Sequence, residues 1–95
     1  MSTVATRNPA RGKKGPRIDA ARYDAMKKAL LAVIPKRGEG VSFSDLERLV
    51  RARLPRETFA GASVPWYATN VKLDLEARGL VRRVAGSGPQ RLLRT

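Results

Sequence analysis

The chain has 95 residues, and its 20 Lys and Arg against 8 Asp and Glu give a formal net charge of +12. This length suits one small domain, and 42% hydrophobic residues suffice for a core. The chain has no Cys and no His, which excludes thiolate zinc sites, disulfide scaffolds and nucleophiles activated by histidine. A polyanion is therefore the first partner to consider.

The first 18 residues form a predicted basic arm. They hold no acid, are interrupted by Gly and Pro, and carry five cations: Arg7, Arg11, Lys13, Lys14 and Arg17. Such a composition is typical of a segment that is extended or disordered when free. We therefore divide the chain into an arm over 1–18 and a folded domain over 19–95.

A first helix is predicted from Asp19 to the residue before Pro35. Asp19 is a good N-cap, and Ile18 and Tyr23 have the spacing of a hydrophobic staple. Apolar residues then recur at helical spacing through Leu30, which predicts one buried stripe. Pro35 ends the helix because proline disfavours helical backbone in the residue before it.

A loop over 35–40, a short strand over 41–43 and a second helix come next. The run from Ser44 to Glu47 has the capping-box pattern, with the serine as N-cap and the glutamate at the third helical position. Apolar residues on one stripe continue this helix until Pro55 ends it.

The third helix is predicted over Val64–Arg78. Ser63 is its expected N-cap, and Gly79 has the place of the left-handed residue that follows many helices. Leu75 and Leu80 then have the spacing of the hydrophobic contact in a Schellman motif.

Two β-prone runs close the chain, Leu80–Val84 and Gln90–Arg94, and the turn-rich segment 85–89 between them suits a hairpin. This element order resembles a winged helix-turn-helix, and the run Leu75–Arg83 is similar to the junction of recognition helix and wing in such domains. The expected fold class is therefore α+β: a winged helix with three helices, a short strand and a C-terminal hairpin as its wing.

A more specific resemblance covers nearly the whole chain. Its motifs are Asn8-Pro9, Arg17-Ile-Asp-Ala-Ala21, Tyr23-Asp-Ala-Met26, Ala29-Leu30, Trp66-Tyr67 and Val71-x-Leu-Asp-Leu-Glu-Ala-Arg-Gly-Leu80. Together they resemble a small bacterial family of unknown function, whose members are single compact domains of about this length. The resemblance implies that part of the arm belongs to the domain, and it implies no catalytic or binding residues.

Charge and topology together predict nucleic-acid binding. The expected phosphate contacts come from the five cations of the arm and from four arginines of the wing: Arg82, Arg83, Arg91 and Arg94. A further basic group lies on and after the second helix, at Arg48, Arg51, Arg53 and Arg56. Thr69, Asn70 and Lys72 are the expected groove contacts. We expect duplex DNA, bound with weak sequence specificity, as by a transcriptional regulator or a nucleoid-associated protein; the alternative is that these cations only solvate the surface.

The third helix complicates this prediction because it is apolar on two sides. Its outward face carries Trp66, Leu73 and Ala77, and Asp74 and Glu76 add acid to the same helix. Three interpretations stay open. The arm or the first helix covers this face and enlarges the core; the face is an interface for a homodimer or another protein; or Trp66 and Tyr67 stack on bases.

Other functional classes find no support in the sequence. Paired carboxylates such as Asp45 and Glu47 are two residues apart on a predicted helix and point apart, so we expect no enzyme. We also expect no cofactor and no metal site. The sequence has neither the roughly 20 apolar residues of a membrane span nor the apolar stretch of a secretory signal, so we expect a cytoplasmic protein without a membrane partner.

Overall fold

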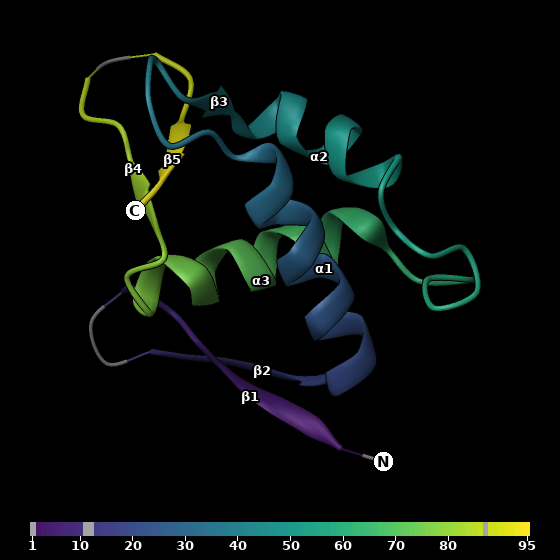
Figure 1. The fold of residues 1–95 in the computed structure, drawn as a ribbon. Coiled ribbons are helices and arrows are strands. Elements are labelled where there is room, and N and C mark those ends of the chain that lie inside the picture. The colour runs from purple at the N-terminus through teal and green to yellow at the C-terminus, as the bar shows by residue number, and fades with distance from the viewer. Residues whose placement is uncertain (1, 11–12, 87) are drawn as a thin grey trace.

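The computed structural model describes residues 2–10, 13–86 and 88–95 and has an α+β fold (Figure 1). α3 lies between two small antiparallel sheets, one at each side of the helical layer (Figure 1). The elements in chain order are β1 (Thr3–Arg7), β2 (Lys14–Asp19), α1 (Ala20–Val33), β3 (Val41–Ser42), α2 (Phe43–Arg51), α3 (Val64–Ala77), β4 (Val81–Arg83) and β5 (Arg91–Arg94). Within the described residues, no helix is both long and apolar enough to cross a membrane.

The N-terminal segment differs from the predicted extended arm. β1 and β2 form an antiparallel hairpin that packs on α3 and α1, and the Ala20 N–H donates to the Ser2 carbonyl at 3.0 Å where the hairpin meets α1. Ile18 is buried in the main core. The hairpin forms although its composition is that of a linker, because it packs against residues far away in the sequence.

The predicted start and end of the first helix are confirmed. Asp19 Oδ2 accepts from the Arg22 N–H at 3.1 Å, and the last turn closes with the Ile34 N–H on the Leu30 carbonyl at 2.9 Å. Tyr23 is buried, as the stripe of apolar residues predicts. The helix ends where Pro35 requires extended backbone before it.

The second helix begins earlier than predicted. Ser42, not Ser44, is its N-cap, and its hydroxyl accepts from the Asp45 N–H at 3.3 Å. Ser42 has extended backbone because it still pairs with Arg91 as the last residue of β3, so the helix starts at the end of the strand. The helix also ends at Arg51, before the predicted stop at Pro55.

The third helix is bounded as predicted. Ser63 Oγ accepts from the Trp66 N–H at 3.3 Å. At the other end, Gly79 has a φ of +79°, the Leu80 N–H donates to the Leu75 carbonyl at 2.9 Å, and the Gly79 N–H donates to the Glu76 carbonyl at 3.1 Å. These two bonds are those of a Schellman motif.

The C-terminal hairpin is confirmed, and it belongs to a three-stranded sheet in the order β3-β5-β4. β4 and β5 pair from Val81 with Arg94 to Arg83 with Leu92. β3 pairs with the other edge of β5, through Val41 with Leu92. We call β4, β5 and the turn between them the wing hairpin, after the wing that the sequence predicts there, and β1, β2 and their turn the N-terminal hairpin.

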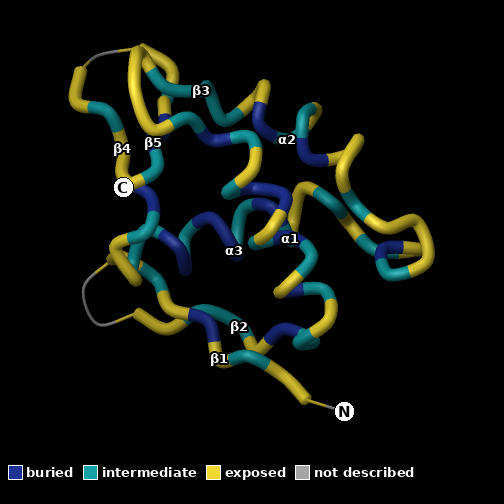
Figure 2. Tube along the Cα trace, in the orientation of Figure 1, coloured by how far each residue is buried: buried dark blue, intermediate teal, exposed yellow. Residues whose placement is uncertain are grey.

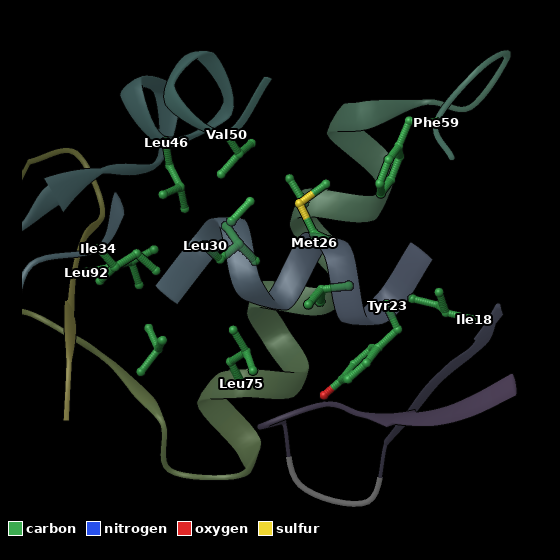
Figure 3. Packing of buried hydrophobic residues seen from close by; sticks show 14 residues of the cluster. Ile18, Tyr23, Met26, Leu30, Ile34, Leu46, Val50, Phe59, Leu75 and Leu92 are labelled. Carbon is green, nitrogen blue, oxygen red and sulfur yellow. The ribbon is translucent and has the colours of Figure 1, made fainter. Parts of the chain in front are cut away.

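One core joins the helices and both hairpins (Figure 3). Figure 2 shows that buried residues alternate with exposed ones along the helices, whereas the turn of the wing hairpin and the loop before α3 are largely exposed. The core side of α3 is the predicted one, with Ala68, Val71 and Leu75 fully buried. Other core side chains are Met26, Leu30, Ile34, Leu46, Val50, Phe59, Val81 and Leu92.

Candidate nucleic-acid interface

Asp74, on α3, is the centre of a buried polar cluster. Its side chain is fully buried and accepts hydrogen bonds from the Arg7 backbone N–H at 2.7 Å, from Arg78 Nε at 2.8 Å and from the Tyr23 hydroxyl. Burial, and then the bond to Asp74, raise the pKa of Tyr23 to about 12, and the hydrogen bond to the same carboxylate raises the pKa of Arg78. Asp74 therefore fastens β1 and α1 to α3.

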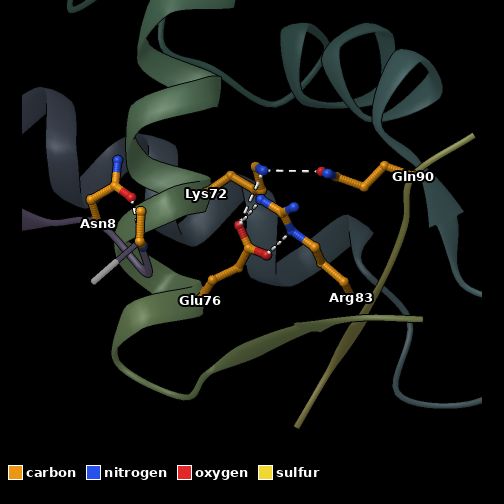
Figure 4. A network of polar contacts seen from close by, with 6 residues as sticks. Asn8, Lys72, Glu76, Arg83 and Gln90 are labelled. Atoms are coloured by element: carbon orange, nitrogen blue, oxygen red, sulfur yellow. Dashed lines mark hydrogen bonds and ion pairs between the residues drawn. The ribbon is translucent and has the colours of Figure 1, made fainter. Parts of the chain in front are cut away.

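Glu76 is the centre of a second polar network (Figure 4). Its carboxylate contacts Lys72 Nζ at 3.1 Å and Arg83 Nε at 2.5 Å, and Lys72 Nζ donates to Gln90 Oε1 at 3.0 Å. Burial lowers the pKa of Lys72, and the hydrogen bond to Glu76 opposes that shift. The network joins α3 to the wing hairpin.

Both acids of α3 are thus engaged inside the molecule, and the side chain of Glu76 is only 7% exposed. The side of α3 that stays in contact with solvent carries half-buried or exposed neutral side chains: Trp66, Thr69, Asn70, Leu73 and Ala77. The acid on this helix therefore does not oppose the approach of an anion to that side as strongly as the sequence suggests.

The N-terminal hairpin contributes cations on one side of α3. A hollow of about 460 Å³ lies between the hairpin and the C-terminal half of α3, and it is lined by Thr6, Arg7, Asn8, Pro9, Lys13, Lys14, Glu76 and Ala77. Arg7, Lys13 and Lys14 are exposed, as is Arg17, whose Nε donates to Thr3 Oγ1 at 3.1 Å. Arg11, predicted with them, lies outside the described residues.

The wing hairpin contributes cations next to the C-terminal half of the same helix. Arg82 and Arg91 are exposed, and neither has an ion-pair partner among the residues that the structure describes. Arg83 is exposed but paired with Glu76, and Arg94 is half-buried with its Nε on the Ile34 carbonyl at 3.1 Å. Arg82 and Arg91 are therefore the wing cations best placed for an external anion.

The basic group on α2 is partly neutralised. Arg51 pairs with Glu47 at 2.9 Å, and Arg48 lies 3.6 Å from Asp45. Arg53 and Arg56, beyond the end of the helix, are exposed. Exposed pairs of this kind contribute little to stability, but they offset the positive charge of this face.

Of the three predicted groove contacts, Lys72 is buried, whereas Thr69 and Asn70 are half-buried. Lys72 is only 4% exposed, and its ammonium is held by Glu76 and Gln90, so it is not available for contact with a groove. The prediction for Lys72 is wrong because its side chain does not reach solvent from the helix but lies over the Phe43 ring, with Nζ 5.1 Å from the ring centre. Thr69 and Asn70 are half-buried, and Asn70 Nδ2 donates to the Trp66 carbonyl at 2.9 Å.

The outward apolar face of α3 is bordered by the N-terminal hairpin at Leu73 and Ala77 and exposed at Trp66. Leu73 lines a hollow with Asn8, Pro9, Ala10, Glu76 and Arg83, and Ala77 lines the hollow beside Arg7 and the lysines. The N-terminal hairpin thus borders both residues, as the first of the three interpretations expects for an arm that covers this face. Trp66, at the other end of the helix, stays 44% exposed.

Sequence reasoning missed the role of Asp74. The residue lies three positions after the buried Val71, a spacing that places it at the edge of the core stripe, and this signal was available. Its partners were not foreseeable, because Tyr23 and Arg7 lie 51 and 67 residues away in the sequence.

No curated protein and no solved structure matches the chain. One family model does match, and it covers residues 3–92, which include the N-terminal hairpin, α1, α2 and α3, both polar networks, and the wing hairpin as far as Leu92. The resemblance drawn from the sequence motifs is thereby confirmed, and part of the N-terminal segment lies within the match. The chain belongs to a family of unknown function, DUF6958.

Proposed function

We propose that this chain is a winged-helix protein that binds nucleic acid, with duplex DNA as its preferred partner, mainly through phosphates. The observation that carries the proposal is that both acids of α3 are paired, Asp74 with Arg78 and Glu76 with Lys72 and Arg83, while the outward side of the helix is neutral and has cations next to it. A protein that uses this surface for an anion gains from neutralising Asp74 and Glu76 with paired cations.

The topology supports the winged-helix assignment. β3 lies between α1 and α2 in the chain and pairs with β5, and the β4–β5 hairpin follows α3 directly. In helix-turn-helix proteins the helix in the position of α3 enters the major groove. Thr69 and Asn70 are the polar side chains of α3 that could reach base edges from there.

The distribution of cations supports binding through phosphates. Arg7, Lys13, Lys14 and Arg17 belong to the N-terminal hairpin, and Arg82 and Arg91 to the wing hairpin. Both hairpins pack on α3, so a duplex placed against this helix would meet cations from both. Each neutralised phosphate releases counterions, which makes the affinity fall steeply with salt.

A protein interface over Trp66, Leu73 and Ala77 is the alternative. The structure gives it less support than the sequence did, because residues of the N-terminal hairpin border Leu73 and Ala77. The remaining exposed apolar surface is small.

The test is fluorescence anisotropy of a labelled random-sequence duplex with the full chain between about 50 and 200 mM salt, the range over which phosphate contacts have a large effect. We expect micromolar or tighter binding at the low end. The double variant Lys13→Ala/Lys14→Ala should bind all sequences more weakly and flatten the plot of log K against log salt by about 0.9 for each phosphate that it no longer neutralises.

Lys28→Ala/Arg53→Ala is the matched control. It removes the same charge from two exposed residues that line a separate hollow on α1, where no residue of α3 or of either hairpin contributes. Its salt dependence should stay close to that of the unmodified chain. An absence of binding at about 50 mM salt, or an equal weakening of binding in the two double variants, would overturn the proposal.

A further inference from the structure

Trp66, in the first turn of α3, is the one large hydrophobic side chain that is exposed among the described residues, and 44% of it is in contact with solvent. Its backbone is fixed on both sides. The N–H donates to Ser63 Oγ at 3.3 Å, and the carbonyl accepts from Asn70 Nδ2 at 2.9 Å.

The indole is also held by its neighbours. It packs against Tyr67 with ring centres 4.9 Å apart and an interplanar angle of 79°. Tyr67 in turn packs edge-on against Phe59, and the Tyr67 hydroxyl accepts a hydrogen bond from Arg22 Nη1 at 2.8 Å. An aromatic side chain fixed in this way loses little conformational freedom when it binds a ligand.

The size of the exposed surface decides which ligand fits. A Trp side chain buries up to about 250 Å², so 44% exposure leaves on the order of 100 Å². A stable protein interface needs about 800 Å² from each partner. Leu73 and Ala77 add little to this area because the N-terminal hairpin borders them. An area of about 100 Å² is close to one face of a single planar ring.

We infer that Trp66 stacks on an unpaired base of a nucleic acid. This inference rests on the proposed function, because the cations of the two hairpins supply the attraction for the phosphates of that strand. Both faces of a base inside a duplex are already covered by its neighbours, whereas a base in a single strand, a bulge or an end has a free face. The chain therefore binds a duplex that offers such a base, at a bulge or a single-stranded end, more tightly than a fully paired duplex.

The test uses the fact that Trp66 is the sole tryptophan of the chain. Its emission is followed while the full chain is titrated with a single-stranded oligonucleotide and, separately, with a strand of equal length in which every base is missing. Quenching by the first strand and none by the second is expected, since only the first can stack. Trp66→Ala should weaken binding of the base-bearing strand by about five- to 150-fold and leave the abasic strand unaffected.

Trp66→Phe keeps a ring and should retain most of the affinity, measured by anisotropy of labelled strands. An unchanged circular dichroism spectrum shows that Trp66→Ala is folded, since a chain of net charge +12 attracts phosphates even when unfolded. If the abasic strand quenches equally, or if both strands lose equal affinity in Trp66→Ala, the stacking inference is wrong and the phosphate proposal stands. If neither strand nor the duplex binds at low salt, the proposed function fails, and the inference fails with it.

Discussion

The two hairpins border the same helix and are held in different ways. The wing hairpin contributes Val81 and Leu92 to the core, and its strand β5 has partners on both edges. The N-terminal hairpin is a two-stranded sheet whose backbone is tied to α3 by the bond from the Arg7 N–H to Asp74. Apolar burial and a continuous sheet thus hold the wing hairpin, whereas the N-terminal hairpin has one core residue, Ile18 on β2, and its strand β1 is tied to α3 by a single buried carboxylate.

The largest effect that tests this difference is expected from Asp74→Ala. The substitution leaves the Tyr23 hydroxyl, the Arg7 N–H and the Arg78 guanidinium without their common acceptor. Removing one partner of a buried ion pair costs about 3–5 kcal/mol, so the free energy of unfolding, measured with urea, should fall by that amount. Native-state hydrogen exchange should reveal reduced protection in β1 and β2 and retained protection in β4 and β5.

Two controls accompany this variant. Asp24→Ala removes the same charge from an exposed position on α1 and should change the free energy of unfolding by less than about 0.5 kcal/mol. Leu92→Ala should lower the free energy of unfolding by about 2–5 kcal/mol. It should reduce hydrogen-exchange protection in the wing hairpin first. Equally reduced protection in both hairpins of Asp74→Ala would mean that they are held as one unit.

The same difference explains which hairpin the sequence could predict. The wing follows a helix end marked by Gly79, and its two β-prone runs flank a turn-rich segment, so all its signals are local. The N-terminal hairpin lacks such signals. Its glycines and prolines are typical of a linker, and its main tie to α3 bridges 67 residues of sequence. Local patterns cannot report a contact of that kind.

An intermediate effect is expected from Gly15→Ala, which tests how closely the two strands of the N-terminal hairpin approach. An added Cβ would overlap with Thr6 Oγ1 and lie 3.2 Å from Thr6 Cβ. Forcing a methyl group into such a space costs about 1–3 kcal/mol, to be measured by urea unfolding. By contrast, a Cβ added at Gly88, in the turn of the wing hairpin, would have no atom within 4 Å, so the close approach is particular to Gly15 in this comparison.

Thr6→Ala supplies the control for that prediction. It removes the overlapping oxygen and also the hydrogen bond from Thr6 to the Pro16 carbonyl, so by itself it should cost about 1 kcal/mol. The double variant should then cost less than the sum of the two single variants. Strict additivity would indicate that Gly15 is required for another reason.

The candidate site was partly predictable for a related reason. The cations of both hairpins and the outward side of α3 follow from composition and helical spacing, which are local properties. The burial of Lys72 does not, because it depends on Gln90, 18 residues later, and on the Phe43 ring. The sequence thus indicated which residue types the surface offers, while tertiary contacts decide which of them are free.

The last effect, a loss of stability at high pH, needs no substitution and follows from the bond between Tyr23 and Asp74. Burial and the bond to Asp74 raise the pKa of Tyr23 from 10.0 to about 12. The folded chain therefore holds the Tyr23 proton more tightly than the unfolded chain. The stabilisation that this proton gives to the fold is complete below about pH 10 and is lost as the pH rises to about 12. The slope is at most about 1.4 kcal/mol per pH unit.

Urea unfolding of the unmodified chain and of Tyr23→Phe across this range isolates the effect, because other titrating groups are common to both. Parallel curves would mean that folding does not raise the pKa of Tyr23, and that neither its burial nor its bond to Asp74 makes stability depend on pH in this range.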